Sequence, residues 1–100
     1  MTTPIPVVID QDLEDIVPGY LENRQKDIKD LNKALEEGDF QTASVLGHRM
    51  KGSGAGYGFD EITEIGKTIE LAAKASDSSA IAEGVSRLVD YLERVEISYE

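Results

Sequence analysis

The chain has 100 residues, of which 40% are hydrophobic, with one histidine, no cysteine and a formal net charge of −10. This length predicts one domain with a modest core. The lack of cysteine excludes disulfides, zinc–thiolate sites and thiol catalysis, and the strong negative charge argues against binding nucleic acid through its phosphates. Neither a basic leader nor an apolar run of membrane-spanning length occurs, so we expect a cytoplasmic protein without a membrane partner.

The first elements of the chain are an extended arm and two helices. Residues 1–9 contain two prolines and predict an extended N-terminal arm. Asp10 is a candidate cap for a short leading helix that reaches Val17, and Pro18 suits the first turn of the next helix. Apolar residues then recur at spacings of three and four as far as Gly38, a residue type that commonly ends helices.

Three more helical stripes follow, the first capped by Asp39 and the last by Asp77. The apolar face of the first stripe contains Phe40, Ala43, Gly47, Met50, Gly54 and Tyr57. The second contains Phe59, Ile62, Ile65, Ile69 and Ala72, and the third contains Ile81, Val85, Leu88, Leu92 and Val95. We find no sustained alternation of period two after residue 10. The sequence therefore predicts an all-α fold, an antiparallel four-helix bundle with a short leading N-terminal helix, over residues 10–97.

The stretch GHRMKGSGAGYG, residues 47–58, fits either a phosphate-binding glycine loop or a helix. The loop requires glycine, four residues, then Gly-Lys-Ser or Gly-Lys-Thr after a strand, whereas here the lysine precedes the glycine. A helix instead turns His48 outward, roughly 140° from the centre of the apolar face. Val45, Gly52 and Ala55 share this outer side, and Lys51 lies one turn after the histidine. The helix is therefore the better interpretation, and the glycines of the inner face allow close helix packing.

The histidine lies in a segment without negative charge. All twenty acidic residues fall outside positions 40–59, and the only charged residues inside are Arg49 and Lys51. A neutral imidazole is a good nucleophile near pH 7, and an adjacent lysine acts as a point charge on phosphoryl oxygens. The sequence indicates no second catalytic base near His48 and no metal cluster. We therefore expect half of an active site, which a partner completes.

The stretch HRMKGSGAGYGFDEI resembles the signature of histidine-containing phosphotransfer (HPt) domains, which is His, two residues, Lys-Gly-Ser or Lys-Gly-Ala, small residues and a glycine. The resemblance extends from about Asp10 to Val95. VPGYLENRQKDI is similar to the helix before the signature, and ALEEGDF to the turn into the histidine helix. The chain departs from the family at Gly47, where alanine is usual.

The resemblance implies a phosphorelay intermediate without kinase activity of its own. His48 would be phosphorylated, Lys51 would stabilise the phosphoryl group, Gly52 would give clearance for the partner, and Gly58 would end the histidine helix. The implied partners are response-regulator receiver domains or a hybrid histidine kinase. The chain would need no cofactor of its own, because the receiver supplies Mg²⁺. We expect a free-standing monomer.

Other residues near the signature have a possible role and a simpler explanation. Val45, Arg49 and Ala55 are candidate docking or phosphate contacts, although exposed small residues need no special reason. Lys74 is a candidate phosphate contact, yet Glu70 precedes it by four residues and an i,i+4 ion pair also explains it. An interaction bundle that binds receivers without carrying phosphate is the alternative function. The presence of both His48 and Lys51 favours the phosphoryl carrier.

Overall fold

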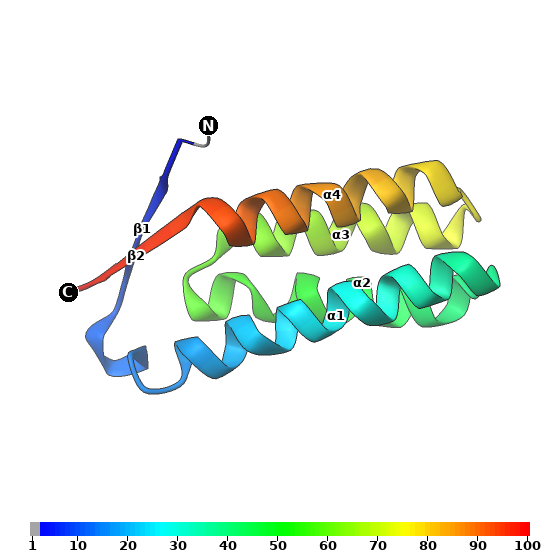
Figure 1. Ribbon diagram of the computed structural model, residues 1–100. Coiled ribbons are helices and arrows are strands. Elements are labelled where there is room, and N and C mark those ends of the chain that lie inside the picture. Colours follow the sequence, from blue (N-terminus) through cyan, green and yellow to red (C-terminus); the bar gives the residue numbers. More distant parts are fainter. Residues whose placement is uncertain (1–2) are drawn as a thin grey trace.

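The computed structural model describes residues 3–100. Within this range, four α-helices form the bundle: α1 (Val17–Glu37), α2 (Phe40–Ser53), α3 (Asp60–Lys74) and α4 (Ser78–Arg94). Each helix lies beside its neighbour in the chain and runs in the opposite direction (Figure 1), as short connections require. The predicted antiparallel helical bundle is confirmed.

Three helix boundaries are formed by the residues that the sequence indicates, Gly38, Asp39 and Asp77. Gly38 follows α1 in the left-handed conformation, with φ of 65°, which glycine adopts without steric strain. Asp39 caps α2, because its carboxylate accepts a hydrogen bond from the N–H of Thr42 at 3.0 Å. Asp77 caps α4 in the same way, accepting from the N–H of Ala80 at 3.1 Å. The connections α1–α2 and α3–α4 are therefore tight.

The histidine helix α2 is shorter than predicted. It ends at Ser53, and a 3-10 helix, Ala55–Tyr57, continues to Gly58, which has φ of 92°. The carbonyl of Gly54 accepts hydrogen bonds from the N–H groups of Tyr57 and Phe59, at 3.1 and 2.8 Å. This pair of bonds tightens the chain, so Tyr57 belongs to the turn and Gly58 ends the 3-10 helix rather than α2.

The predicted leading helix from Asp10 to Val17 is wrong in extent. Only Gln11–Leu13 forms a helical turn, of the 3-10 type, and α1 itself begins at Val17. Asp10 does act as a cap, but it accepts from the N–H of Asp12, two residues on, which closes a single turn. The N–H of Gln11 donates to the carbonyl of Glu100 at 3.0 Å, so this segment is fixed by the C-terminal end of the chain.

A two-stranded parallel sheet, absent from the prediction, joins the two ends of the chain (Figure 1). Strand β1 (Ile5–Ile9) lies in the segment predicted to be extended, and pairs with β2 (Val95–Tyr99) in the register Ile5↔Val95 to Ile9↔Tyr99. In β2, half-buried Val, Ile and Tyr alternate with exposed Glu and Ser. This five-residue alternation was missed because Val95 also continues the helical stripe of α4, whose last residue is Arg94.

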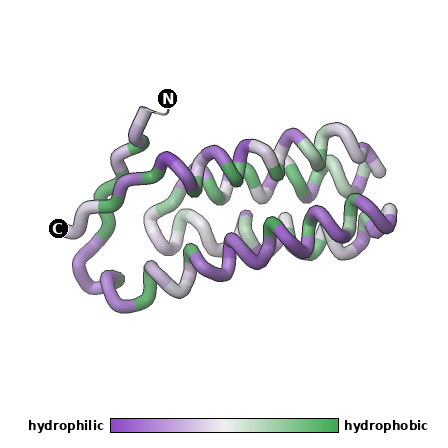
Figure 2. Tube along the Cα trace, in the orientation of Figure 1, coloured by the Kyte–Doolittle hydropathy of each residue, from purple (hydrophilic) through white to green (hydrophobic). Residues whose placement is uncertain are grey.

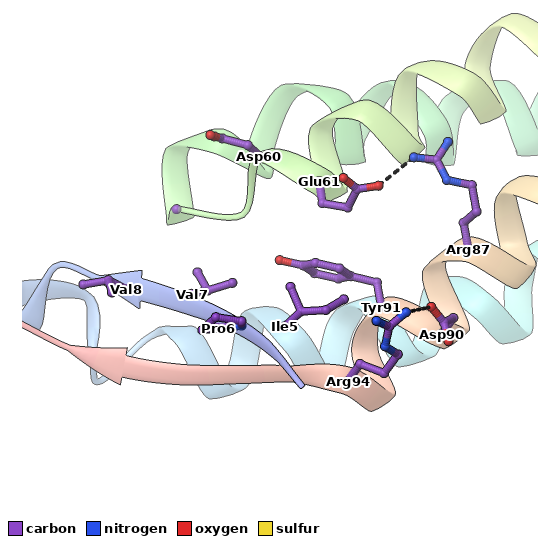
Figure 3. A pocket seen from close by; sticks show the side chains of 11 residues that line it. Ile5, Pro6, Val7, Val8, Asp60, Glu61, Arg87, Asp90, Tyr91 and Arg94 are labelled. Carbon is purple, nitrogen blue, oxygen red and sulfur yellow. Dashed lines mark hydrogen bonds and ion pairs between the residues drawn. The ribbon is translucent and has the colours of Figure 1, made fainter. Parts of the chain in front are cut away.

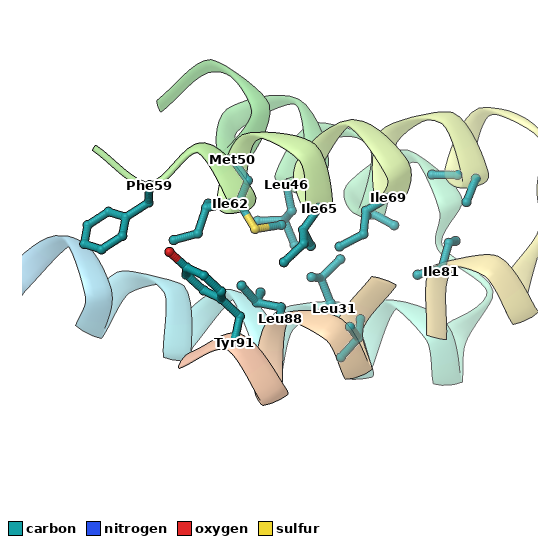
Figure 4. Close-up of a cluster of buried hydrophobic side chains, with 14 of the residues drawn as sticks. Leu31, Leu46, Met50, Phe59, Ile62, Ile65, Ile69, Ile81, Leu88 and Tyr91 are labelled. Atoms are coloured by element: carbon teal, nitrogen blue, oxygen red, sulfur yellow. The ribbon is translucent and has the colours of Figure 1, made fainter. Parts of the chain in front are cut away.

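The core lies between the helices and consists of buried apolar side chains. Hydrophobic and hydrophilic residues alternate along each helix of the bundle (Figure 2). The large, fully buried side chains of the core come from all four helices and from the segments beside them (Figure 4): Phe59, Ile9, Leu31, Met50, Ile62, Ile65, Ile69, Ile81, Leu88 and Val17. Leu46 of α2 is buried as well, although the predicted stripe omitted it. None of the helices in residues 3–100 is long and apolar enough to span a bilayer.

Candidate functional site

His48 lies on the outer side of α2, as the helical geometry predicts. Its side chain is 67% exposed, and its Nδ1 lies 2.8 Å from Oε2 of Glu70 on α3. An ionised carboxylate only accepts hydrogen bonds, so Nδ1 is the nitrogen that donates. The imidazole then has its lone pair on Nε2, to which no other group of residues 3–100 is hydrogen-bonded. The histidine therefore presents one nucleophilic nitrogen.

Glu70 is the centre of the site. It is the one charged side chain that is buried within residues 3–100, and its carboxylate contacts three other side chains. Oε1 lies 2.7 Å from Nζ of Lys51, and Oε2 lies 2.8 Å from His48 and 3.5 Å from Nζ of Lys74. The hydrogen bond from Lys51 is the main cause that lowers the pKa of Glu70 to about 2, helped by the bond from His48 and opposed by burial. Glu70 is therefore ionised at neutral pH.

The sequence indicated no second catalytic base near His48, but in the structure the carboxylate of Glu70 lies beside it. The segment without acidic residues covers α2 alone, and the carboxylate arrives from α3, 22 residues further along the chain. Sequence reasoning considered Glu70 only as the ion-pair partner of Lys74. The sequence carried little signal for this, because a residue that follows a member of the buried stripe of α3 is exposed in one case, Asp60 after Phe59, and buried in another, Glu70 after Ile69.

Two glycines bring α2 and α3 close enough for these contacts. A Cβ on Gly47 would lie 2.6 Å from the backbone N of Glu70 and 2.8 Å from the carbonyl O of Gly66. A Cβ on Gly66 would in turn lie 2.7 Å from the carbonyl O of Gly47. Backbone therefore packs on backbone at this crossing, as predicted for Gly47, and an alanine here would require the helices to shift. Gly66 was not predicted.

Lys51 and Lys74 both lie where the sequence suggested. Lys51, on α2 one turn after His48, is 38% exposed and forms the short contact with Glu70. Lys74, on α3 one turn after Glu70, is 63% exposed, and the predicted i,i+4 pair is present. The structure thus gathers His48, Lys51 and Lys74 around one buried carboxylate.

The surface next to the histidine is flat at Gly52. This residue is exposed, and a Cβ built on it would have no neighbour within 4 Å. Ala55 is also exposed and lies in the 3-10 helix, held by a hydrogen bond of 2.8 Å from its N–H to Oγ1 of Thr63. Val45, one turn before His48, and Arg49, the residue after it, also line a hollow of about 630 Å³ between α1 and α2. They lie on the side of the histidine towards α1, whereas Lys51 lies on the side towards α3.

A second hollow, of about 570 Å³, lies between β1 and the adjoining ends of α3 and α4 (Figure 3). Its two arginines are already paired, Arg87 with Glu61 at 2.6 Å and Arg94 with Asp90 at 2.9 Å. None of the predicted site residues lines it. No group of three or more His, Cys, Asp or Glu side chains suited to a metal ion occurs in residues 3–100.

Comparison with models of known families shows the family to which the chain belongs. The family model of the Hpt domain matches residues 15–97, so the chain belongs to the Hpt domain family. Searches of curated proteins and of solved structures returned no match. Membership implies a phosphotransfer role in phosphorelay signalling, in which Hpt domains carry phosphoryl groups and interact with receiver and kinase domains.

Proposed function

We propose that this protein is a phosphorelay intermediate that carries the phosphoryl group on Nε2 of His48. The group comes from the aspartyl phosphate of a receiver domain, or from a histidine kinase system, and passes to the receiver of a response regulator. The observation that carries the proposal is the bond between Nδ1 and Glu70, which leaves Nε2 as the free nucleophile at an exposed position.

The transfer step follows from this arrangement. The lone pair of Nε2 attacks the phosphorus, the P–O bond to the receiver aspartate breaks, and the electron pair leaves on the aspartate carboxylate. Nδ1 keeps its proton in the hydrogen bond to Glu70, so the positive charge that the ring gains lies 2.8 Å from a carboxylate. This orientation of a histidine by a carboxylate is a general way to fix its tautomer.

Lys51 and Gly52 have separate roles in the proposal. The ammonium of Lys51, one turn from His48, neutralises the phosphoryl oxygens as they arrive. Gly52 leaves the surface open, so that the active site of the receiver reaches the imidazole. Ala55 extends this open surface. Val45 and Arg49 are proposed to contact the body of the partner along the hollow between α1 and α2. The receiver contributes Mg²⁺, and the chain needs no cofactor of its own.

The test is transfer from a phosphorylated receiver. Incubation of the protein with a ³²P-labelled receiver and Mg²⁺ is expected to give an acid-labile, base-stable label on this chain, and none with ATP alone. His48→Gln should remain unlabelled while its helical circular dichroism is unchanged. Label that persists on His48→Gln would refute the assignment. Receiver binding without any label would instead support an interaction bundle that carries no phosphate. The monomeric state and the cytoplasmic location stay predictions.

A further inference from the structure

Glu70 has two lysine neighbours that differ in closeness. Nζ of Lys51, from α2, lies 2.7 Å from Oε1, whereas Nζ of Lys74, from the next turn of α3, lies 3.5 Å from Oε2. Together with His48 on α2, these lysines are the charged or titratable groups within 4 Å of the carboxylate in residues 3–100. The buried carboxylate thus has one close counter-ion, Lys51, and a second, more distant one, Lys74.

Phosphorylation creates competition for Lys51. This step of the argument rests on the proposed function, because it requires a phosphoryl group on His48. Lys51 follows His48 by three residues on one helix, the spacing at which helical side chains meet, so its ammonium can reach the new dianion. The same ammonium is already hydrogen-bonded to Glu70. Moving it to the phosphoryl group would leave a carboxylate with 7% exposure without its closest counter-ion and with the N–H of His48 as its remaining hydrogen-bond donor. The loss of one partner of a buried charge is unfavourable.

Lys74 is placed to remove this conflict. It follows Glu70 by four residues, the spacing at which helical side chains meet, and its side chain is 63% exposed and thus free to move. Closing from 3.5 Å to hydrogen-bond distance needs only a change of rotamer. We propose that Lys74 is the reserve counter-ion of Glu70, which takes over the carboxylate when Lys51 turns to the phosphoryl group. Lys74 is thus a positioning residue that acts through Lys51.

The proposal differs from a direct contact between Lys74 and the phosphoryl group. A direct contact would act whether or not Lys51 is present. A reserve counter-ion acts only while Lys51 and the carboxylate of Glu70 are both present. Its effect is to release Lys51 from that carboxylate. The two cases are therefore separated by a double-mutant cycle.

The experiment uses phosphoramidate, a small phosphoryl donor whose P–N bond breaks and releases ammonia as the Nε2–P bond forms. After the donor is removed, the first-order loss of phosphohistidine is measured for the wild type, Lys74→Met, Lys51→Met and the double variant. We expect Lys74→Met to change this rate constant about three- to tenfold, in the same direction as Lys51→Met. In the Lys51→Met background, Lys74→Met should change it less than about twofold.

Matched controls separate charge from structure. Lys29→Met removes an exposed lysine of α1, one that makes no ion pair within residues 3–100, and should leave the rate constant unchanged. Lys74→Arg should retain the wild-type value. If the double variant does not fold, Lys74→Met is measured in a Glu70→Gln background, where it should also have no effect because there is no carboxylate to hold.

The outcomes of the double-mutant cycle test the role of Lys74. Equal effects of Lys74→Met with and without Lys51 would overturn the proposal, as would no effect in the wild-type background. If His48 is phosphorylated normally and the effects of Lys74→Met and Lys51→Met on the rate constant are additive, only the role of Lys74 is refuted. A wild-type protein that takes no phosphoryl group from phosphoramidate or from a receiver would refute the proposed function and this inference together.

Discussion

At the scale of single residues, the open surface at Gly52 gives a test of docking. A Cβ at this position has no neighbour within 4 Å, so we expect Gly52→Gln to gain up to about 1 kcal/mol from better helix propensity. The glutamine side chain would stand beside His48, in the path of the receiver. Gly52→Gln should therefore lose both phosphoryl transfer and binding of the unphosphorylated receiver, as measured by calorimetry.

A matched control exists for this change. Gly19, on α1, is likewise exposed and a Cβ on it has nothing within 4 Å, so Gly19→Gln adds the same side chain away from the site. It should transfer and bind as the wild type does. Normal receiver binding by Gly52→Gln would mean that the flat surface has no role in docking.

Glu70 predicts a specific dependence of stability on pH. Its pKa is lowered to about 2 in the folded protein, from an ordinary value of 4.5. The unfolded chain therefore binds this proton more readily, so the stabilisation is complete above about pH 4.5 and is lost as the pH falls towards 2. Glu70→Gln removes this contribution, and its urea midpoint should fall less steeply between these pH values than that of the wild type. Parallel midpoint curves for the two proteins would show that Glu70 is not ionised and paired as described.

At the scale of the elements, the α2–α3 crossing decides whether the site forms. Gly47→Ala would place its Cβ 2.6 Å from the backbone N of Glu70, and backbone does not yield as a flexible side chain does. The two helices must separate, so we expect a loss of about 1–3 kcal/mol in the free energy of unfolding. The His48–Glu70 hydrogen bond should weaken, which NMR of the imidazole reports.

Gly52→Ala is the control for the crossing, since it makes the same substitution on the same helix at an open position. It should be neutral or stabilising by up to about 1 kcal/mol. If both alanine variants were equally stable, the close approach of α2 and α3 would not be a requirement of this fold.

The elements also show what the sequence predicts well. Helices with apolar residues at spacings of three and four were predicted, and so were the caps at Asp39 and Asp77, because both depend on local geometry. The parallel strands were not, because β1 and β2 pair residues about 90 positions apart and no local pattern reports such a contact. The prediction of the leading helix was wrong for the same reason, since the N–H of Gln11 donates a hydrogen bond to the carbonyl of Glu100 at the far end of the chain.

At the scale of the whole molecule, the fold assembles a site whose parts are distant in sequence. The motif around His48 predicted the histidine, Lys51 and the open Gly52, because all three lie on one helix. Glu70 was not predicted as their partner, because it lies on α3 and reaches His48 through the glycine-mediated approach of two backbones. In a chain of net charge −10, two lysines lie at this carboxylate, and in the proposed function one of them, Lys51, faces the phosphoryl group.

The central claim is that the bond between Nδ1 and Glu70 reserves Nε2 of His48 for phosphorylation. The most direct measurement is ¹⁵N NMR of the histidine-labelled protein after treatment with phosphoramidate, which distinguishes the two ring nitrogens. The account predicts coupling of ³¹P to Nε2, with Nδ1 still protonated, and no phosphorus on the protein in His48→Gln. Phosphorus on Nδ1, or a ring that remains unmodified under conditions that phosphorylate free imidazole, would contradict the account.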